Sequence, residues 1–239
     1  MVWVAGVDGC PRGWFRICRE AESGALAFDL LEHPAQIWGA APKPLVIAID
    51  MPIGLPPRGA RECDRAARAL LGPRRSSVFP APLRASLAAA DRAEASRLTQ
   101  AIDGRGVGAQ AFGIYPKIRA LDEALRSALP TDVIVREAHP ELCFRAWNAG
   151  APMAHPKRTP EGLAERLRCV ARWLGAGLLD QARAAGSEGR FRKKDLADDD
   201  ILDAAATLWT ADRIAKGRAA RVPEEAPLDE CGLPMEIVY

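Results

Sequence analysis

Acidic residues stand at the ends of several predicted elements of secondary structure, where side chains from distant parts of the chain can meet. Asp8, Asp50 and Glu137 each end or follow an apolar run that is typical of a buried strand. These strands are predicted over residues 2–7, 45–50 and 132–136. Because ligands of α/β sheets bind at the carboxyl ends of strands, the three acids are candidates for one shared site.

Two further acids, Asp200 and Asp203, lie near the start of a helix predicted over residues 198–216. Their spacing of three residues places both carboxylates on the same face of that helix. Asp203 is flanked by Leu202 and the alanine run 204–206, where a solvated acid is less expected. The pair can therefore join the acids that follow the strands.

Carboxylates that converge without basic neighbours repel one another, and a divalent cation with oxygen ligands relieves that repulsion. The predicted cofactor is Mg²⁺ or Mn²⁺, and two such ions about 4 Å apart can promote phosphodiester cleavage. The predicted ligands are Asp8, Asp50, Glu137, Asp200 and Asp203, and all of them except Glu137 are also predicted to be catalytic. A structural alternative stays open for the individual acids: a turn at Asp8-Gly9, a loop cap at Asp50, and helix capping at 198–200.

The surrounding pattern predicts a single α/β domain over residues 1–239. Additional strands over 14–18 and 25–31 complete an antiparallel meander with the first strand. Helices are predicted over 33–41, 140–148, 160–185 and 198–216. Residues 51–130 show no strand pattern and are predicted to form a helical insertion or cap, with helices over 60–71, 91–102 and 108–128.

Basic residues gather in two segments that can contact an anionic substrate. Residues 58–84 hold seven Arg and two acids, and the segment 190–194 holds Arg190, Arg192, Lys193 and Lys194. One explanation is a phosphate-binding cap over the acidic site, and the other is a solvated, salt-bridged surface. The predicted substrate-binding residues are Arg61, Arg68, Arg74, Arg75, Lys117 and Lys157. His139 is the one histidine that we consider for a functional role, and with 6% aromatic residues no base-stacking platform is predicted.

The composition excludes several classes of protein. A hydrophobic content of 49% argues against disorder, and a net charge of +2 argues against a wholly basic nucleic-acid binder. No apolar run reaches the roughly 18–20 residues of a membrane helix, and the N-terminal residues do not resemble a signal peptide. The six cysteines form no C-x-x-C pair. We therefore expect a cytoplasmic protein without a membrane partner, whose cysteines are mostly core residues and which can form a homodimer.

Five segments, in order along the chain, carry a family resemblance. They are GVDGCPRGW (6–14), IDMPIGLP (49–56), RECDRAARALLGPRRSSVF (61–79), EAHPELCF (137–144) and DDDILDAAATLWTADRIAKG (198–217). Together they resemble a bacterial and archaeal family of unknown function that is described as predicted ribonuclease H-like nucleases. The resemblance implies a ribonuclease H-like fold, a five-stranded mixed sheet with helices on both faces, here with a helical insertion after the fourth strand.

In ribonuclease H-like nucleases, as the resemblance implies, acids lie on the first strand, at the end of the fourth strand and on the last helix. Asp8, Asp50 and the pair Asp200 and Asp203 match these positions. An acid on the first helix has no counterpart here, since residues 34–41 contain no carboxylate. That departure makes the chain more similar to the RuvC-like branch.

The sequence therefore predicts a metal-dependent nuclease that hydrolyses phosphodiester bonds in nucleic acid or in another phosphate-bearing ligand. One alternative is a phosphotransferase or nucleotide hydrolase, because sugar kinases and actin-like ATPases share this core, usually in two copies. A non-catalytic binding protein that retains the fold is the other alternative, because fold does not by itself determine function.

Overall fold

The structure, a computed structural model, describes residues 1–185 and 191–239. Its strands are β1 (Trp3–Cys10), β2 (Gly13–Glu20), β3 (Leu26–Leu31), β4 (Val46–Asp50), β5 (Ile134–Glu137), β6 (Arg221–Val222) and β7 (Ile237–Val238). Its helices are α1 (Gln36–Gly39), α2 (Glu62–Leu71), α3 (Arg92–Asp103), α4 (Ala109–Gly113), α5 (Tyr115–Ala128), α6 (Pro140–Trp147), α7 (Pro160–Leu174), α8 (Leu178–Ala184) and α9 (Asp198–Ala215), with short 3₁₀ helices η1 (Gly72–Ser77) and η2 (Arg84–Ser86).

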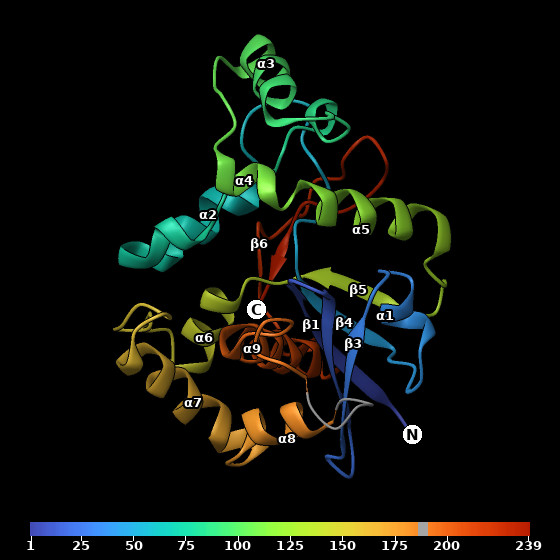
Figure 1. The fold of residues 1–239 in the computed structure, drawn as a ribbon, viewed down its shortest axis with the longest axis vertical. Coiled ribbons are helices and arrows are strands. Elements are labelled where there is room, and N and C mark those ends of the chain that lie inside the picture. The colour runs from blue at the N-terminus through green and yellow to red at the C-terminus, as the bar shows by residue number, and fades with distance from the viewer. Residues whose placement is uncertain (186–190) are drawn as a thin grey trace.

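Five strands form one mixed sheet in the order β3-β2-β1-β4-β5 (Figure 1). Strand β2 is antiparallel to both β1 and β3, whereas β4 is parallel to β1 and β5 is parallel to β4. The first three strands are the predicted meander. The predicted α/β class and the predicted five-stranded mixed sheet are thus confirmed.

Helices cover both faces of this sheet, with α9 and α5 on opposite sides (Figure 1). Val4 and Ala48 pack into a core with residues of α6, α7, α8 and α9. Ala5 and Ile47, their neighbours in the strands, pack into a second core with residues of α1 and α5. Successive side chains of a strand point to opposite faces, so each central strand contributes to both cores.

Helix α9 lies directly against β1 because Gly6 has no side chain. A Cβ atom at Gly6 would lie 2.1 Å from the backbone nitrogen of Leu208 and 2.2 Å from the carbonyl oxygen of Ala204. The alanines Ala204, Ala205 and Ala206 are fully buried at this contact. Small residues on both elements therefore let the helix backbone approach the sheet backbone.

The segment between β4 and β5 is helical, as predicted, and every residue from 51 to 130 is described without a strand. It has two parts. Ile118, Leu121 and Leu125 of α5 pack on the sheet and belong to its second core. Helix α3 lies farther out (Figure 1), and α3 and α4 share a small separate core with Tyr115. The segment thus supplies one layer of the main fold as well as an outlying lobe.

The helix predicted over 160–185 is two helices, α7 and α8. Gly175 and Gly177 separate them with φ angles of 83° and 88°, in the left-handed region that glycine adopts at low cost. The apolar spacing continued across this break, so periodicity alone did not reveal it.

The helix predicted over 108–128 is also interrupted, at Ile114, between α4 and α5. Pro116 is in the first turn of α5. Backbone N–H groups there have no partner within the helix, so the N–H that proline lacks costs no hydrogen bond. The β6–β7 pair near the C-terminus was not predicted, because strands of two residues are too short to show a period.

Within the described ranges no helix combines the length and the apolar composition that crossing a bilayer requires. All six cysteines are free and five of them are buried, in agreement with the predicted role of most of them as core residues.

We expect Gly6→Ala to destabilise the protein by about 3 kcal/mol, because the new methyl group must push α9 away from β1. At this chain length such a loss lowers the melting temperature by roughly 6–12 °C in thermal unfolding followed by circular dichroism. Gly39→Ala is the matched control, since a Cβ atom there meets nothing within 4 Å. Equal melting temperatures for the two variants would contradict the close contact.

Candidate functional site

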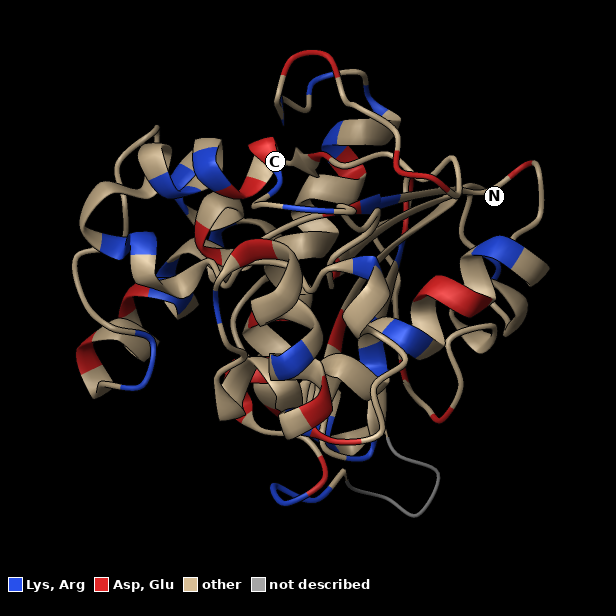
Figure 2. Ribbon diagram, turned by 90° about the horizontal axis from the view of Figure 1, so that it is seen from above, with Lys and Arg blue, Asp and Glu red and all other residues tan. Residues whose placement is uncertain are grey.

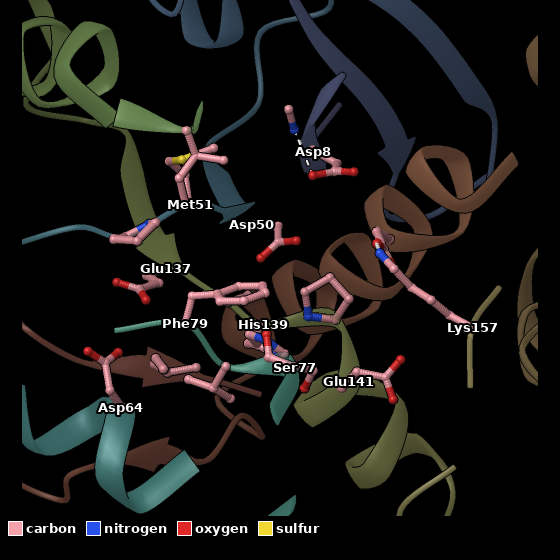
Figure 3. Close-up of a pocket in the computed structure, with 18 of the residues that line it drawn as sticks. Asp8, Asp50, Met51, Asp64, Ser77, Phe79, Glu137, His139, Glu141 and Lys157 are labelled. Carbon is pink, nitrogen blue, oxygen red and sulfur yellow. Dashed lines mark hydrogen bonds and ion pairs between the residues drawn. The ribbon is translucent and has the colours of Figure 1, made fainter. Parts of the chain in front are cut away.

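Three carboxylates that are distant in the sequence converge at the carboxyl ends of β1 and β4. Asp8 and Asp50 are direct partners in the parallel register, and Asp203 approaches them from the second turn of α9. One oxygen of each carboxylate lies within 4.8 Å of the other two. Figure 3 shows the Asp8 and Asp50 carboxylates facing the same space. We call Asp8, Asp50 and Asp203 the acidic triad.

The register of the sheet explains why Asp8 and Asp50 meet. Asp8 is an even number of residues from Val4, and Asp50 from Ala48, so both acids lie on the face that α9 covers. The absent side chain at Gly6 brings α9 close enough for Asp203 to complete the group.

Burial raises the pKa of all three carboxyl groups, and repulsion by neighbouring carboxylates adds to the effect. The pKa of Asp8 is raised well above its ordinary value, first by burial and then by Asp50 and Asp203. The pKa of Asp50 is raised to about 8 by burial and by Asp203. Burial is also the largest cause of the raised pKa of Asp203.

Lys157 forms an ion pair with the triad. Its Nζ lies 2.6 Å from Asp203 Oδ2 and 3.7 Å from Asp199 Oδ2. Burial disfavours the ammonium, but the attraction of Asp203, Asp50 and Asp8 outweighs burial and raises the pKa of Lys157. When a bound cation keeps all three carboxylates ionised, this one ammonium leaves two negative charges at the triad.

These residues fit a divalent cation. The donors are carboxylate oxygens, the ligands that Mg²⁺ and Mn²⁺ prefer. Within the described part of the chain, the buried Asp203 Oδ1 has no hydrogen-bond partner, and a buried oxygen without a partner is costly. One divalent cation would satisfy that oxygen and balance the two negative charges.

A cleft of about 620 Å³ opens in front of the triad. Its volume lies within the range of small-molecule sites. The triad, Lys157 and Arg158 form its charged end. Another part of its wall is apolar and consists of Met51, Pro52, Val78, Phe79, Pro80 and Ile114. The cleft can therefore take a ligand that has one anionic end and one flat, apolar end.

The structure does not bring Glu137 into the triad. Glu137 is the register partner of Ile49, so its side chain lies on the opposite face of the sheet. There it receives two hydrogen bonds from Arg61, at 2.6 and 2.7 Å, and one from the backbone of Ile53. Burial raises the pKa of Glu137 to about 7 although Arg61 opposes the rise. Glu137 lines the cleft at a different place from the triad.

Arg61, which the sequence predicts to contact substrate, is instead fully engaged inside the protein. Its guanidinium bonds Glu137, Asp64 and the carbonyl oxygens of Ile53 and Gly54, and Arg61 is only 3% exposed. No N–H of this group is left for a ligand. Arg61 therefore holds the loop after β4 and the start of α2 against β5.

Asp200 and Lys117 lie beside the triad and make protein contacts. Asp200 Oδ2 accepts a hydrogen bond of 2.8 Å from the backbone of Ala197 and so caps α9, and burial raises its pKa to about 6. Lys117 lines the cleft, and its Nζ donates to the Gly13 carbonyl oxygen at 2.7 Å. Burial lowers the pKa of Lys117.

The other arginines predicted to bind substrate divide into two groups. Arg68 donates to the Val78 carbonyl oxygen and Arg74 to that of Met153, so both fix loops at the cleft. Arg75 is exposed and does not line the cleft.

The predicted basic segment before α9 makes contacts of its own in the residues that the structure describes. Arg190 lies outside the described residues. Arg192 pairs with Asp195, and Lys193 lies 3.7 Å from Asp198. Neither contact reaches the triad.

Glu141, Arg158 and Phe79 line the cleft, although sequence reasoning did not select them. Glu141 is buried against Arg166 near the triad, where it contributes to the raised pKa of Asp50. An acid in the first turn of a helix is common for capping alone, so its sequence context gave no distinct signal.

His139 is half-buried, and its Nε2 lies 3.3 Å from the Ser77 carbonyl oxygen. Desolvation lowers the pKa of His139, which favours the neutral imidazole. In the tautomer that carries a proton on Nε2, His139 donates to the loop that leads to Phe79.

A family model described as "Protein of unknown function (DUF429)" matches residues 6–228. The match spans most of the chain, which therefore belongs to this family. No curated protein and no solved structure matches the chain.

We expect Arg61→Met to cost about 3–5 kcal/mol of stability, because it leaves Glu137 and Asp64 buried without their counter-charge. Urea unfolding measures the loss. Arg65→Met is the control, since Arg65 is exposed and donates only to the Ala60 carbonyl oxygen; its effect should stay within about 0.5 kcal/mol. Similar losses for both variants would refute the structural role of Arg61.

We expect Mn²⁺ to raise the melting temperature of the protein through the triad. At about 100 times its dissociation constant a ligand adds about 2.7 kcal/mol, roughly 5–10 °C at this chain length. Asp50→Asn and Asp203→Asn should abolish the rise, whereas Asp132→Asn, at an exposed position away from the cleft, should retain it. A full rise in the triad variants would place the cation elsewhere.

Proposed function

We propose that this family member is a metal-dependent nuclease that hydrolyses phosphodiester bonds at the acidic triad. The observation that carries the proposal is the convergence of Asp8, Asp50 and Asp203, with oxygens within 4.8 Å of one another, at one end of an open cleft. Carboxylates so arranged suit Mg²⁺ or Mn²⁺ and a phosphate-bearing ligand.

We also propose that the fold is ribonuclease H-like. The sheet order β3-β2-β1-β4-β5, the antiparallel meander and the parallel β4 and β5 support this assignment. So does the placement of acids on β1, at the end of β4 and on the last long helix. Asp200, one turn before Asp203, caps α9, so we place it outside the set of direct metal ligands.

Bound Mg²⁺ or Mn²⁺ would supply a Lewis acid for the phosphoryl oxygen and lower the pKa of water. The chain's own residues prepare the ligands. Asp8 Oδ1 is held by the Gly9 backbone N–H at 2.7 Å, and Lys157 holds Asp203 through Oδ2, which leaves Oδ1 available. These contacts fix the carboxylates before any ligand binds.

Two cationic side chains that line the cleft can bind the phosphate of a substrate. Arg158 is exposed and lines the cleft next to Lys157. Lys117 lines the other side near Gly9 and uses one of its three N–H donors on Gly13. A phosphodiester between them would lie in front of the triad.

We expect the purified protein to cleave at least one of branched DNA, an RNA–DNA hybrid and single-stranded DNA or RNA when Mn²⁺ is present. Asp50→Asn should reduce the rate at least about 100-fold, because the lost metal ligand accounts for several kcal/mol of transition-state stabilisation. Asp132→Asn should retain the full rate. Cleavage that persists in Asp50→Asn and in EDTA would overturn the assignment, as would the absence of cleavage across the panel.

A further inference from the structure

Phe79 is an exposed aromatic residue inside the cleft. Its side chain is 43% exposed, and it lines the same cavity as the triad. Figure 3 shows the ring projecting into the cleft on the side where Asp50 lies. A large apolar side chain left open to water beside a charged site is a candidate ligand contact.

Residues on both sides of Phe79 hold its loop in place. Val78 is 2% exposed and packs against α2 and α6. Arg68 donates to the Val78 carbonyl oxygen at 2.7 Å, and His139 contacts the Ser77 carbonyl oxygen. Asp64 accepts a hydrogen bond from the backbone of Ala81. A ring presented by a fixed loop loses little conformational entropy when a ligand stacks on it.

The cleft offers a base-sized wall next to a phosphate-sized end. Pro80, Met51 and Ile114 extend the apolar surface around Phe79. Exposed Ser76 and Gln110 at its rim can hydrogen-bond a polar edge. The triad, Lys157 and Arg158 line the same cleft, and Figure 3 shows Asp50 close to the Phe79 ring. Nucleotides combine these features, a flat π-face with a polar edge and an anionic phosphate.

Size and charge favour a single nucleotide strand over a duplex. A cleft of about 620 Å³ is of the size of small-molecule sites, not of a groove that tracks a double helix. Figure 2 shows Lys and Arg interspersed with Asp and Glu over the ribbon in this view, not gathered on one face. Duplex binders commonly present a basic stripe or patch.

We propose that the cleft binds one nucleotide unit, free or within a single strand, with its base stacked on Phe79 and its phosphate at the triad. This inference rests on the proposed phosphodiester chemistry and names its substrate class. Phe79 is then a specificity-determining residue. The low aromatic content of the chain does not oppose this, because one fixed ring suffices for one base.

The test compares binding of four fluorescent or competing probes in Ca²⁺ buffer: a short single-stranded oligonucleotide, the same strand with abasic sites, the corresponding duplex, and a free mononucleotide. Phe79→Ala should weaken single-strand binding about 10-fold or more, the usual effect of removing one stacked base. Phe79→Trp should retain the affinity. Leu228→Ala is the control, since Leu228 is 64% exposed but lies outside the cleft.

The abasic strand should bind the unaltered protein about as weakly as the intact strand binds Phe79→Ala. A mononucleotide that matches the single strand identifies free nucleotides as the ligand, and a much weaker one identifies strands; both support the proposal. Tighter binding of the duplex, or equal binding of abasic and intact strands, would overturn it. Unchanged affinity in Phe79→Ala would also overturn it.

Hydrolysis is measured separately in Mn²⁺, so that the two ideas can fail independently. Base-dependent binding that Phe79→Ala weakens, without cleavage of any probe, would support nucleotide binding in the cleft and contradict the nuclease assignment. Cleavage that depends on Asp50 but not on Phe79 or on the base would uphold the nuclease and remove the stacking role.

Discussion

Helix α9 and strand β1 touch through their backbones, with no side chain at Gly6 between them. The interaction is packing without a gap, and it needs Gly6 on the strand and the buried alanines 204–206 on the helix. It sets the height of α9 above the sheet. The position of Asp203 relative to Asp8 and Asp50 follows from that height, and so does the wall of the cleft that α9 supports.

Buried acids in this protein are stabilised in two different ways. Glu137, Glu141 and Asp229 each pair with an arginine, namely Arg61, Arg166 and Arg84. These guanidiniums also bond backbone carbonyls or a second acid, so each joins several parts of the chain. The acidic triad has no such arginine partner among the described residues and shares one ammonium, Lys157. This difference in compensation, not burial itself, distinguishes a cation site from a structural ion pair.

The arginine-rich segment after β4 has a role different from the one its charge indicates. The net charge of +5 over residues 58–84 would indicate a phosphate-binding cap if these arginine side chains had no partners within the protein. In the structure Arg61, Arg68 and Arg74 donate to acids and carbonyl oxygens of the protein. They shape the loop that presents Phe79, so their effect on a ligand is indirect. Lys117, Lys157 and Arg158 line the cleft and remain candidates for direct contact with a ligand.

Local patterns in the sequence predicted most of the elements, the class of the fold and all three acids of the triad. Apolar runs that end in Asp8 and Asp50 predict buried strands. The two acids can share one site only if these strands are neighbours in the sheet. The helical spacing of Asp203 among alanines marked it as unusual. Local patterns could not show where glycine pairs such as Gly175 and Gly177 break a continuous apolar period.

Tertiary structure decided which polar residues face one another. Parallel register puts Asp8 beside Asp50, and the alternation of side chains turns Glu137 to the opposite face, to Arg61. The sequence does not show which face of the sheet an acid at a strand end occupies, because a shift of one residue in register moves its side chain to the other face. Likewise, Phe79 is one more apolar residue in the sequence, and only the fixed loop around it leaves its ring open in the cleft. The sequence gives the type of each residue, whereas the contacts between residues depend on distances that only the folded chain sets.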